Sequence, residues 1–178
     1  MKRKVEVVAY NPAWPGLFEE EKARIAAVLG DMTLNIYHIG STSVQGLAAK
    51  PIIDIMAVVR DIVAVAECNH GMEEIGYTAM GEYGIPGRRL FTRRDVDAAH
   101  RVNVHVFQHG DTNVERHLAF RDYLRAFPAA AAEYAGIKIG LAKKFTWDIE
   151  SYIDGKDCFI KETERKAIEW YRHTGNEP

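Results

Sequence analysis

Long apolar runs and cysteines are scarce in this sequence. No stretch approaches the roughly 20 apolar residues that a membrane-spanning helix needs, and the basic start at 2–4 is not followed by the apolar segment of a secretory signal. Only Cys68 and Cys158 are present, far apart and without metal-binding spacing, so we expect free thiols in a reducing compartment. These absences predict a cytoplasmic protein with no membrane partner.

An excess of charge of one sign is also missing. The 23 basic and 25 acidic residues leave a formal charge of −2, which gives no strong sign of nucleic-acid binding. Repeats, low-complexity runs and linkers rich in Ser, Gly or Pro are absent, so the 178 residues predict one domain over 1–178 with its own core. Nothing in the composition fixes an oligomeric state.

Apolar periodicity predicts helices at both ends of the chain and strands between them. We expect a first helix after the turn at 11–15, ended by Gly30, and further helices over 61–75, 113–127, 129–144 and 158–171. The expected strands are 34–39, 52–59, 90–93 and 101–107, with a polar loop over 95–100. The pattern indicates an α+β fold, a mixed sheet flanked by helices with a helical C-terminal third.

A Gly-Ser turn follows the first strand, in the order His38, Gly40, Ser41, Thr42 and Ser43. Glycine lets a ligand approach the backbone closely, and hydroxyls and N–H groups at a helix start suit phosphate oxygens. Turns of this composition that only cap a helix are common, and that alternative stays open.

Asp54 interrupts the apolar strand 52–59. A buried carboxylate needs a partner, a metal or a position at an exposed strand end; a structural role, accepting backbone hydrogen bonds, is the alternative. Together with the Gly-Ser turn, Asp54 is typical of a site that holds a nucleotide's phosphates beside a divalent cation.

At this point the chain resembles a known family. The run 38–55 (HIGSTSVQGLAAKPIIDI) is similar to the signature of the GrpB family, and the ordered segments 10–14, 104–106, 117–124 and 155–156 extend the resemblance over nearly the whole chain. The resemblance implies a minimal nucleotidyltransferase-like fold with helical additions. It also implies, by analogy with family domains joined to dephospho-coenzyme A kinase, a link to coenzyme A or nucleotide metabolism.

The wider nucleotidyltransferase superfamily uses two or three carboxylates to hold two Mg²⁺ ions, and this chain departs from that pattern. Asp54 matches the first carboxylate, but Met56 occupies the second position, and the third falls to Asn103 or His105. Methionine does not ligate a hard cation. A nucleotide-type pocket is therefore the leading interpretation, with metal-assisted nucleotidyl transfer as an extension of it and Asp54 and His105 as catalytic candidates.

A metal site built on His38, Asp54 and His105 is a further hypothesis. Such nitrogen and oxygen donors suit Zn²⁺ or another transition metal better than Mg²⁺, and Mg²⁺, Mn²⁺ or Zn²⁺ is the divalent cofactor that we consider. A purely structural hydrogen-bond network of the two histidines is the alternative. A non-catalytic binding or partner module that kept the fold and lost the carboxylates is the other class of function considered.

Several basic residues are candidates for binding the phosphates of a nucleotide or phosphorylated small molecule. The candidates near the turn and the Gly-rich loop are Lys50, Arg88, Arg89 and Arg93, added to Gly40, Ser41, Thr42 and Ser43. Lys138, Lys143 and Lys156 are weaker candidates, because basic residues on helices are usually solvated surface groups.

Overall fold

A mixed five-stranded sheet runs through the centre of the computed structural model, which describes residues 4–94 and 101–175. The strands are β1 (Thr33–Ile39), β2 (Ile52–Val59), β3 (Thr78–Ala79), β4 (Arg89–Arg94) and β5 (Arg101–Gln108), in the spatial order β1-β2-β5-β4-β3. The central pair β2 and β5 is parallel and the other pairs are antiparallel.

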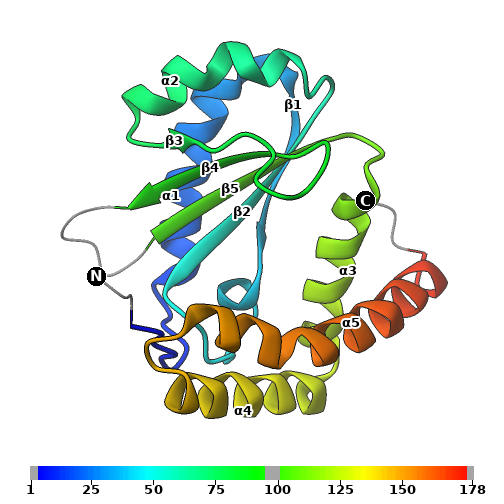
Figure 1. The fold of residues 1–178 in the computed structure, drawn as a ribbon. Coiled ribbons are helices and arrows are strands. Elements are labelled where there is room, and N and C mark those ends of the chain that lie inside the picture. The colour runs from blue at the N-terminus through cyan, green and yellow to red at the C-terminus, as the bar shows by residue number, and fades with distance from the viewer. Residues whose placement is uncertain (1–3, 95–100, 176–178) are drawn as a thin grey trace.

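Helices cover the two faces of this sheet unequally. In Figure 1, α1 (Trp14–Leu29) lies behind the sheet, whereas α3 (Thr112–Ala126), α4 (Pro128–Lys144) and α5 (Ile149–His173) form a group below and to the right. The short α2 (Asn69–Glu74) packs with α1. Three 3₁₀ helices complete the order, η1 (Gly30–Met32), η2 (Ser41–Ser43) and η3 (Ala64–Cys68).

Alternation along β2 divides the core into two apolar layers, because successive side chains of a strand point to opposite faces. Ile53 and Ile55 pack toward α1, whereas Met56 and Val58 pack toward α3 and α5. Asp54 is on the second face, beside Ile39 of β1 and Asn103 of β5 in the sheet register. The α3 side therefore carries the polar residues of the sheet's central strands.

The predicted α+β fold is confirmed, with differences at its margins. Strand 52–59 has the expected bounds, and the helix before Gly30 ends there. Helix 61–75 is replaced by η3 and α2, the last helix begins at Ile149 instead of Cys158, and the two-residue β3 was missed. The predicted loop over 95–100 lies outside the described residues. Cys68 and Cys158 are free thiols, as expected.

Within 4–94 and 101–175, no helix is long and apolar enough to cross a membrane.

A buried ion pair joins the first helix to the sheet. Arg93 of β4 donates to Glu21 Oε2 at 2.7 Å, and Tyr77 donates to the same oxygen at 2.6 Å. Arg93 is only 9% exposed and faces α1, on the opposite face of the sheet from Asp54. The expectation that Arg93 binds the ligand's phosphates is thus replaced by a structural role, because strand alternation turns its side chain to the other layer.

Replacing Arg93 by methionine removes this pair and leaves a buried carboxylate with fewer partners. We expect Arg93→Met to lower the free energy of unfolding by about 3 kcal/mol, measured by urea denaturation. The matched control is Arg94→Met, the next residue of β4, whose side chain is exposed; its effect should stay within about 0.5 kcal/mol. Equal effects of the two substitutions would contradict this assignment.

Candidate functional site

The Gly-Ser turn forms a tight corner at the end of β1. Gly40 has φ 70° and ψ −173°, a conformation that is essentially restricted to glycine. The N–H of Ser43 donates to the carbonyl of Gly40 at 3.2 Å, and its hydroxyl donates to the same oxygen at 2.6 Å. Thr42 donates to the carbonyl of Ile52 at 3.0 Å. The turn is therefore held both within itself and to β2.

Asp54 lies directly against this turn. A Cβ placed on Gly40 would lie 2.8 Å from Asp54 Oδ2, so the close approach requires glycine. Asn103 donates to Asp54 Oδ1 at 2.8 Å, and His105 Nε2 lies 3.7 Å from that oxygen. Burial alone would raise the pKa of Asp54, but His105, Asn103 and the charge of Lys50 together lower it. Asp54 is therefore an anion, and its side chain is 28% exposed.

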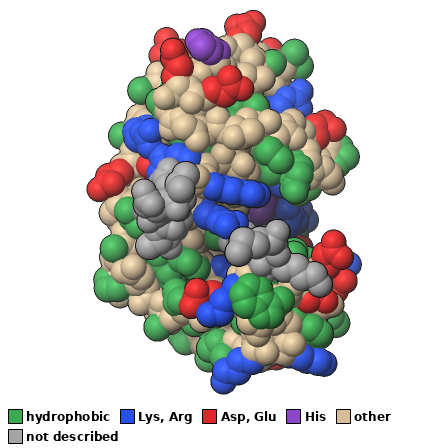
Figure 2. Space-filling model, turned by 60° about the vertical axis from the view of Figure 1, so that its left-hand side comes forward, with side chains coloured by type: hydrophobic (Ala, Val, Ile, Leu, Met, Phe, Trp, Pro, Cys, Tyr) green, Lys and Arg blue, Asp and Glu red, His purple; other side chains and the backbone are tan. Residues whose placement is uncertain are grey.

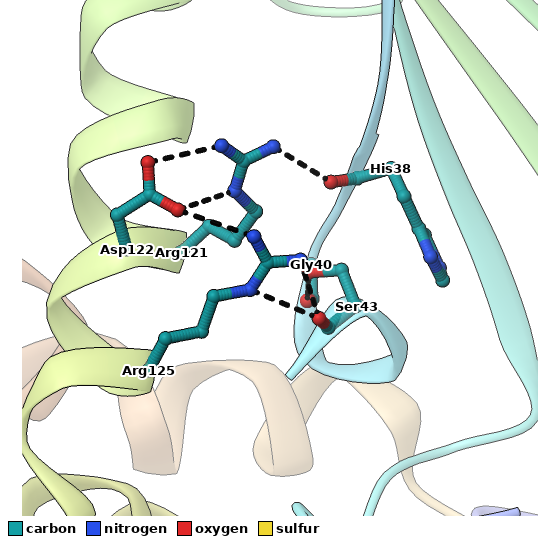
Figure 3. Close-up of polar contacts among 6 residues, drawn as sticks. All are labelled: His38, Gly40, Ser43, Arg121, Asp122 and Arg125. Atoms are coloured by element: carbon teal, nitrogen blue, oxygen red, sulfur yellow. Dashed lines mark hydrogen bonds and ion pairs between the residues drawn. The ribbon is translucent and has the colours of Figure 1, made fainter. Parts of the chain in front are cut away.

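Two arginines of α3 hold the turn from its outer side (Figure 3). Arg121 donates to the carbonyl of His38 at 3.2 Å, and Arg125 donates to the carbonyl of Ser43 at 2.7 Å. Asp122 accepts from both guanidinium groups, at 2.7 Å from Arg121 and 3.3 Å from Arg125. These contacts fix the carbonyls on both sides of Gly40 and Ser41. Neither Arg121 nor Arg125 was among the site residues predicted from the sequence.

A cavity of about 250 Å³ opens beside the turn. It is lined by residues of the turn, of β2 and β5, and of the three C-terminal helices, among them Gly40, Ser41, Thr42, Lys50, Asp54, Asn103, Tyr134, Lys138, Tyr152 and Lys156. Figure 2 shows Lys and Arg side chains gathered around a hollow across the middle of one face of the molecule. Six of these ten residues precede the C-terminal helices, and the other four lie on α4 and α5.

Lys138 connects α4 to the turn. It donates to the hydroxyl of Ser41 at 2.9 Å and to the carbonyl of Ala48 at 2.5 Å, and it is only 2% exposed. Burial and the neighbouring charges of Lys156 and Lys50 lower the pKa of Lys138 to about 7. Lys138 is therefore a buried cationic group poised to gain or lose its proton near neutral pH.

The other two lysines of the cavity share one aromatic ring. The ammonium groups of Lys50 and Lys156 lie 5.1 and 5.6 Å from the ring centre of Tyr152. Burial also lowers the pKa of Lys156, although the charge of Asp54 opposes this. Lys50 and Lys156 thus join Lys138 in the cavity, whereas Lys143 is exposed elsewhere on α4.

Arg88 contacts the site indirectly, through His105. Its Nη1 lies 3.2 Å from His105 Nδ1, and its other donors reach the carbonyls of Glu82 and Tyr83. Arginine has no acceptor, so His105 Nδ1 must accept and Nε2 carries the proton that points toward Asp54. Arg88 is 5% exposed, and its place is behind His105 instead of in the cavity.

Two further residues predicted to bind phosphate, Arg89 and Ser43, have other contacts. Arg89 donates to the carbonyl of Arg88 and lies 3.8 Å from Glu82, and it is not among the described lining residues. Ser43 donates to the carbonyl of Gly40 and so stabilises the turn, and it is not among the described residues that line this cavity.

His38 is not brought to Asp54 and His105. In the sheet register His38 is paired with Ile55, so its ring lies on the α1 face, where it stacks on Phe18 and contacts Thr42 Oγ1 at 3.0 Å. Burial lowers the pKa of His38 to about 4, so the ring is neutral. Among the residues described, no three His, Cys, Asp or Glu side chains are grouped as metal ligands. The proposed set of three ligands is therefore not assembled.

Comparison with known proteins identifies the relatives of this chain. The family model described as GrpB protein matches residues 4–166. The UPF0157 protein YqkA of Bacillus subtilis (strain 168) is 46% identical over 175 residues, which are 98% of this chain. The chain spans only 50% of the length of YqkA.

Two solved structures show the same fold. The crystal structure of the conserved protein GrpB from Enterococcus faecalis has a TM-score of 0.88 at 42% identity and covers 93% of this chain and 99% of its own. The Cid1 poly(U) polymerase has a TM-score of 0.53 at 5% identity over 78% of this chain and 43% of its own. At that identity the second likeness concerns the fold alone, which is nucleotidyltransferase-like.

Gly40→Ala tests the contact between the turn and Asp54. We expect the substitution to lower the free energy of unfolding by about 3 kcal/mol, because backbone strain of 1–3 kcal/mol adds to a clash at 2.8 Å with Asp54 Oδ2. Gly110→Ala is the control, since its φ is also positive, at 84°, but nothing lies within 4 Å of a Cβ there. Urea denaturation of both variants measures the difference, and equal losses would argue against the contact.

The pH dependence of stability tests the burial of Lys138. An unfolded lysine titrates near 10.4, so between pH 7 and 10 the unfolded chain binds more protons and stability rises with pH. We expect the wild type to gain about 1 kcal/mol per pH unit relative to Lys138→Met between pH 7 and 9. Lys143→Met, on the exposed side of the same helix, should follow the wild type. Parallel pH profiles of wild type and Lys138→Met would contradict the assignment.

Proposed function

This chain belongs to the GrpB family and has a nucleotidyltransferase-like fold, and from that premise we propose that its cavity binds a nucleotide or another phosphorylated small molecule. The observation that carries the proposal is the convergence of Lys50, Lys138 and Lys156 on the Ser41 turn. Among the described residues that line the cavity, Asp54 is the single carboxylate beside Lys50, Lys156 and the partly protonated Lys138. The cavity therefore has an excess of positive charge that a phosphate group would neutralise.

The size of the cavity indicates which part of the ligand it accepts. Sites that enclose a drug-sized ligand have volumes of about 300–1,000 Å³, and this one has about 250 Å³. The phosphate end of a nucleotide fits such a space, with its sugar and base lying toward the opening. In this arrangement the hydroxyl of Ser41, Lys50 and Lys156 contact phosphate oxygens, while the buried Lys138 holds the hydroxyl of Ser41 from behind.

The side chains at the site fit a two-metal centre poorly. Asp54 supplies one carboxylate, and its Oδ1 already accepts from Asn103. Met56, at the position of a second carboxylate, is fully buried in the apolar layer. Mg²⁺ prefers several oxygen ligands, so the proposal centres on binding, and metal-assisted nucleotidyl transfer stays the second candidate.

Calorimetry with pyrophosphate, ATP, GTP, CTP, UTP and dephospho-coenzyme A tests the proposal. Each compound is titrated alone and with Mg²⁺, Mn²⁺ or Zn²⁺. We expect at least one to bind, and Lys50→Gln and Lys156→Gln each to weaken its affinity about tenfold or more, since a charged hydrogen bond contributes about 1.5–3 kcal/mol.

Lys143→Gln is the matched control and should bind like the wild type. Absence of binding by every compound, or equal affinities for all variants, would overturn the proposal. Incubation with α-phosphate-labelled nucleotides separates the two candidates, because a labelled covalent product would favour transfer and a bound, unchanged nucleotide favours binding alone.

A further inference from the structure

A second, larger cavity lies on the other side of the Gly-Ser turn. Its volume is about 730 Å³, and it is bounded by the segment 43–47, the start of α1, the end of α3 and the start of α4. No described residue lines both cavities. Between them lies an apolar cluster that includes Val44, Leu47 and Tyr134. The second cavity is therefore a separate site and not an extension of the first.

The walls of this cavity are mainly apolar. Leu124 of α3 and Pro128, Ala131 and Ala132 of α4 line one side, Leu47 lines another, and the small alanines leave room beside α4. The volume is within the range of about 300–1,000 Å³ typical of sites for small organic ligands. A ring-sized apolar group would replace water against these side chains, which is favourable in proportion to the area buried.

Arg125 supplies charge to an otherwise uncharged wall. It is the single charged residue among the described residues that line the cavity, and 44% of its side chain is exposed. Asp122 meets Arg121 with both oxygens, at 2.7 and 2.9 Å, and Arg125 with one, at 3.3 Å (Figure 3). The single negative charge of Asp122 is thus shared by the guanidinium groups of Arg121 and Arg125. One positive charge of this trio stays unbalanced beside the cavity.

We propose that this cavity binds a small organic anion, with an apolar ring system against α4 and one acidic group at Arg125. The site is independent of the phosphate-binding cavity and stands whether or not a nucleotide binds there. Its ligand would contact the side chain that also holds the carbonyl of Ser43, so an occupant sits directly behind the turn that borders the first cavity. Planar acids such as aryl carboxylates or sulfonates match this chemistry, because the guanidinium fork pairs with two acidic oxygens.

A pair of fluorescent probes tests the proposal with the intact chain. The anionic probe 8-anilinonaphthalene-1-sulfonate has the required apolar body and acidic group, and N-phenyl-1-naphthylamine has the same body without the charge. We expect the sulfonate to bind at least about tenfold more tightly than the neutral probe, and Arg125→Gln to remove most of that difference. Arg125→Lys, which keeps the charge but loses the fork, should fall between them.

A second variant identifies the cavity without changing its charge. Ala132→Trp fills the space from an exposed position on α4 and should abolish binding of both probes. Ala129→Trp, also exposed on α4 but not among the lining residues, is the control and should bind like the wild type. Circular dichroism confirms that each variant is folded. Binding that is unchanged in both Ala132→Trp and Arg125→Gln, or equal for the two probes, would overturn the proposal.

Discussion

The contact between Gly40 and Asp54 determines the arrangement of the rest of the site. The antiparallel register of β1 and β2 brings the end of β1 beside Asp54, and the missing side chain of Gly40 lets the turn close over the carboxylate. Ser41 is thereby placed at the mouth of the cavity, within reach of Lys138. Any side chain at position 40 would push the turn away from the strand, and the hydroxyl with it.

The charges around this contact are coupled to one another. Asp54 is stabilised as an anion by Asn103, His105 and Lys50, and its charge in turn favours the protonated form of Lys156. Arg88, behind His105, fixes which ring nitrogen carries the proton. Asp54 is the one carboxylate among the described residues that line this cationic cavity. It favours an anionic ligand more strongly than it favours a cluster of divalent cations.

The sequence singled out the Gly-Ser turn and Asp54, which the structure places against each other, because the signals for these residues are local. Each signal depends on a few neighbouring residues. A glycine and hydroxyls after a strand indicate a tight turn, and an aspartate within an apolar strand indicates a carboxylate that needs a partner. His38 and Arg93 were placed wrongly because the sequence does not show which face of the sheet a strand residue points to. The sheet register pairs His38 with Ile55 and Arg93 with Val102, so both side chains lie on the α1 face.

The lysines of the helices were underrated for a different reason. Lys138 is one helical turn from both Tyr134 and Ala142, which are buried, so its position on the apolar stripe of α4 was a usable sign of burial. The packing of α4 and α5 beside the turn brings Lys138 to Ser41 and Lys156 near Asp54. It depends on contacts between distant segments, such as the one between Lys138 and Ser41, which are 97 residues apart. No local pattern encodes those contacts.

The most direct measurement of the central claim is a crystal structure of the chain grown with ATP. The account predicts phosphate density at the hydroxyl of Ser41, in contact with Lys50 and Lys156 and beside Asp54. Phosphates bound at a different surface, with this cavity holding only solvent, would contradict it.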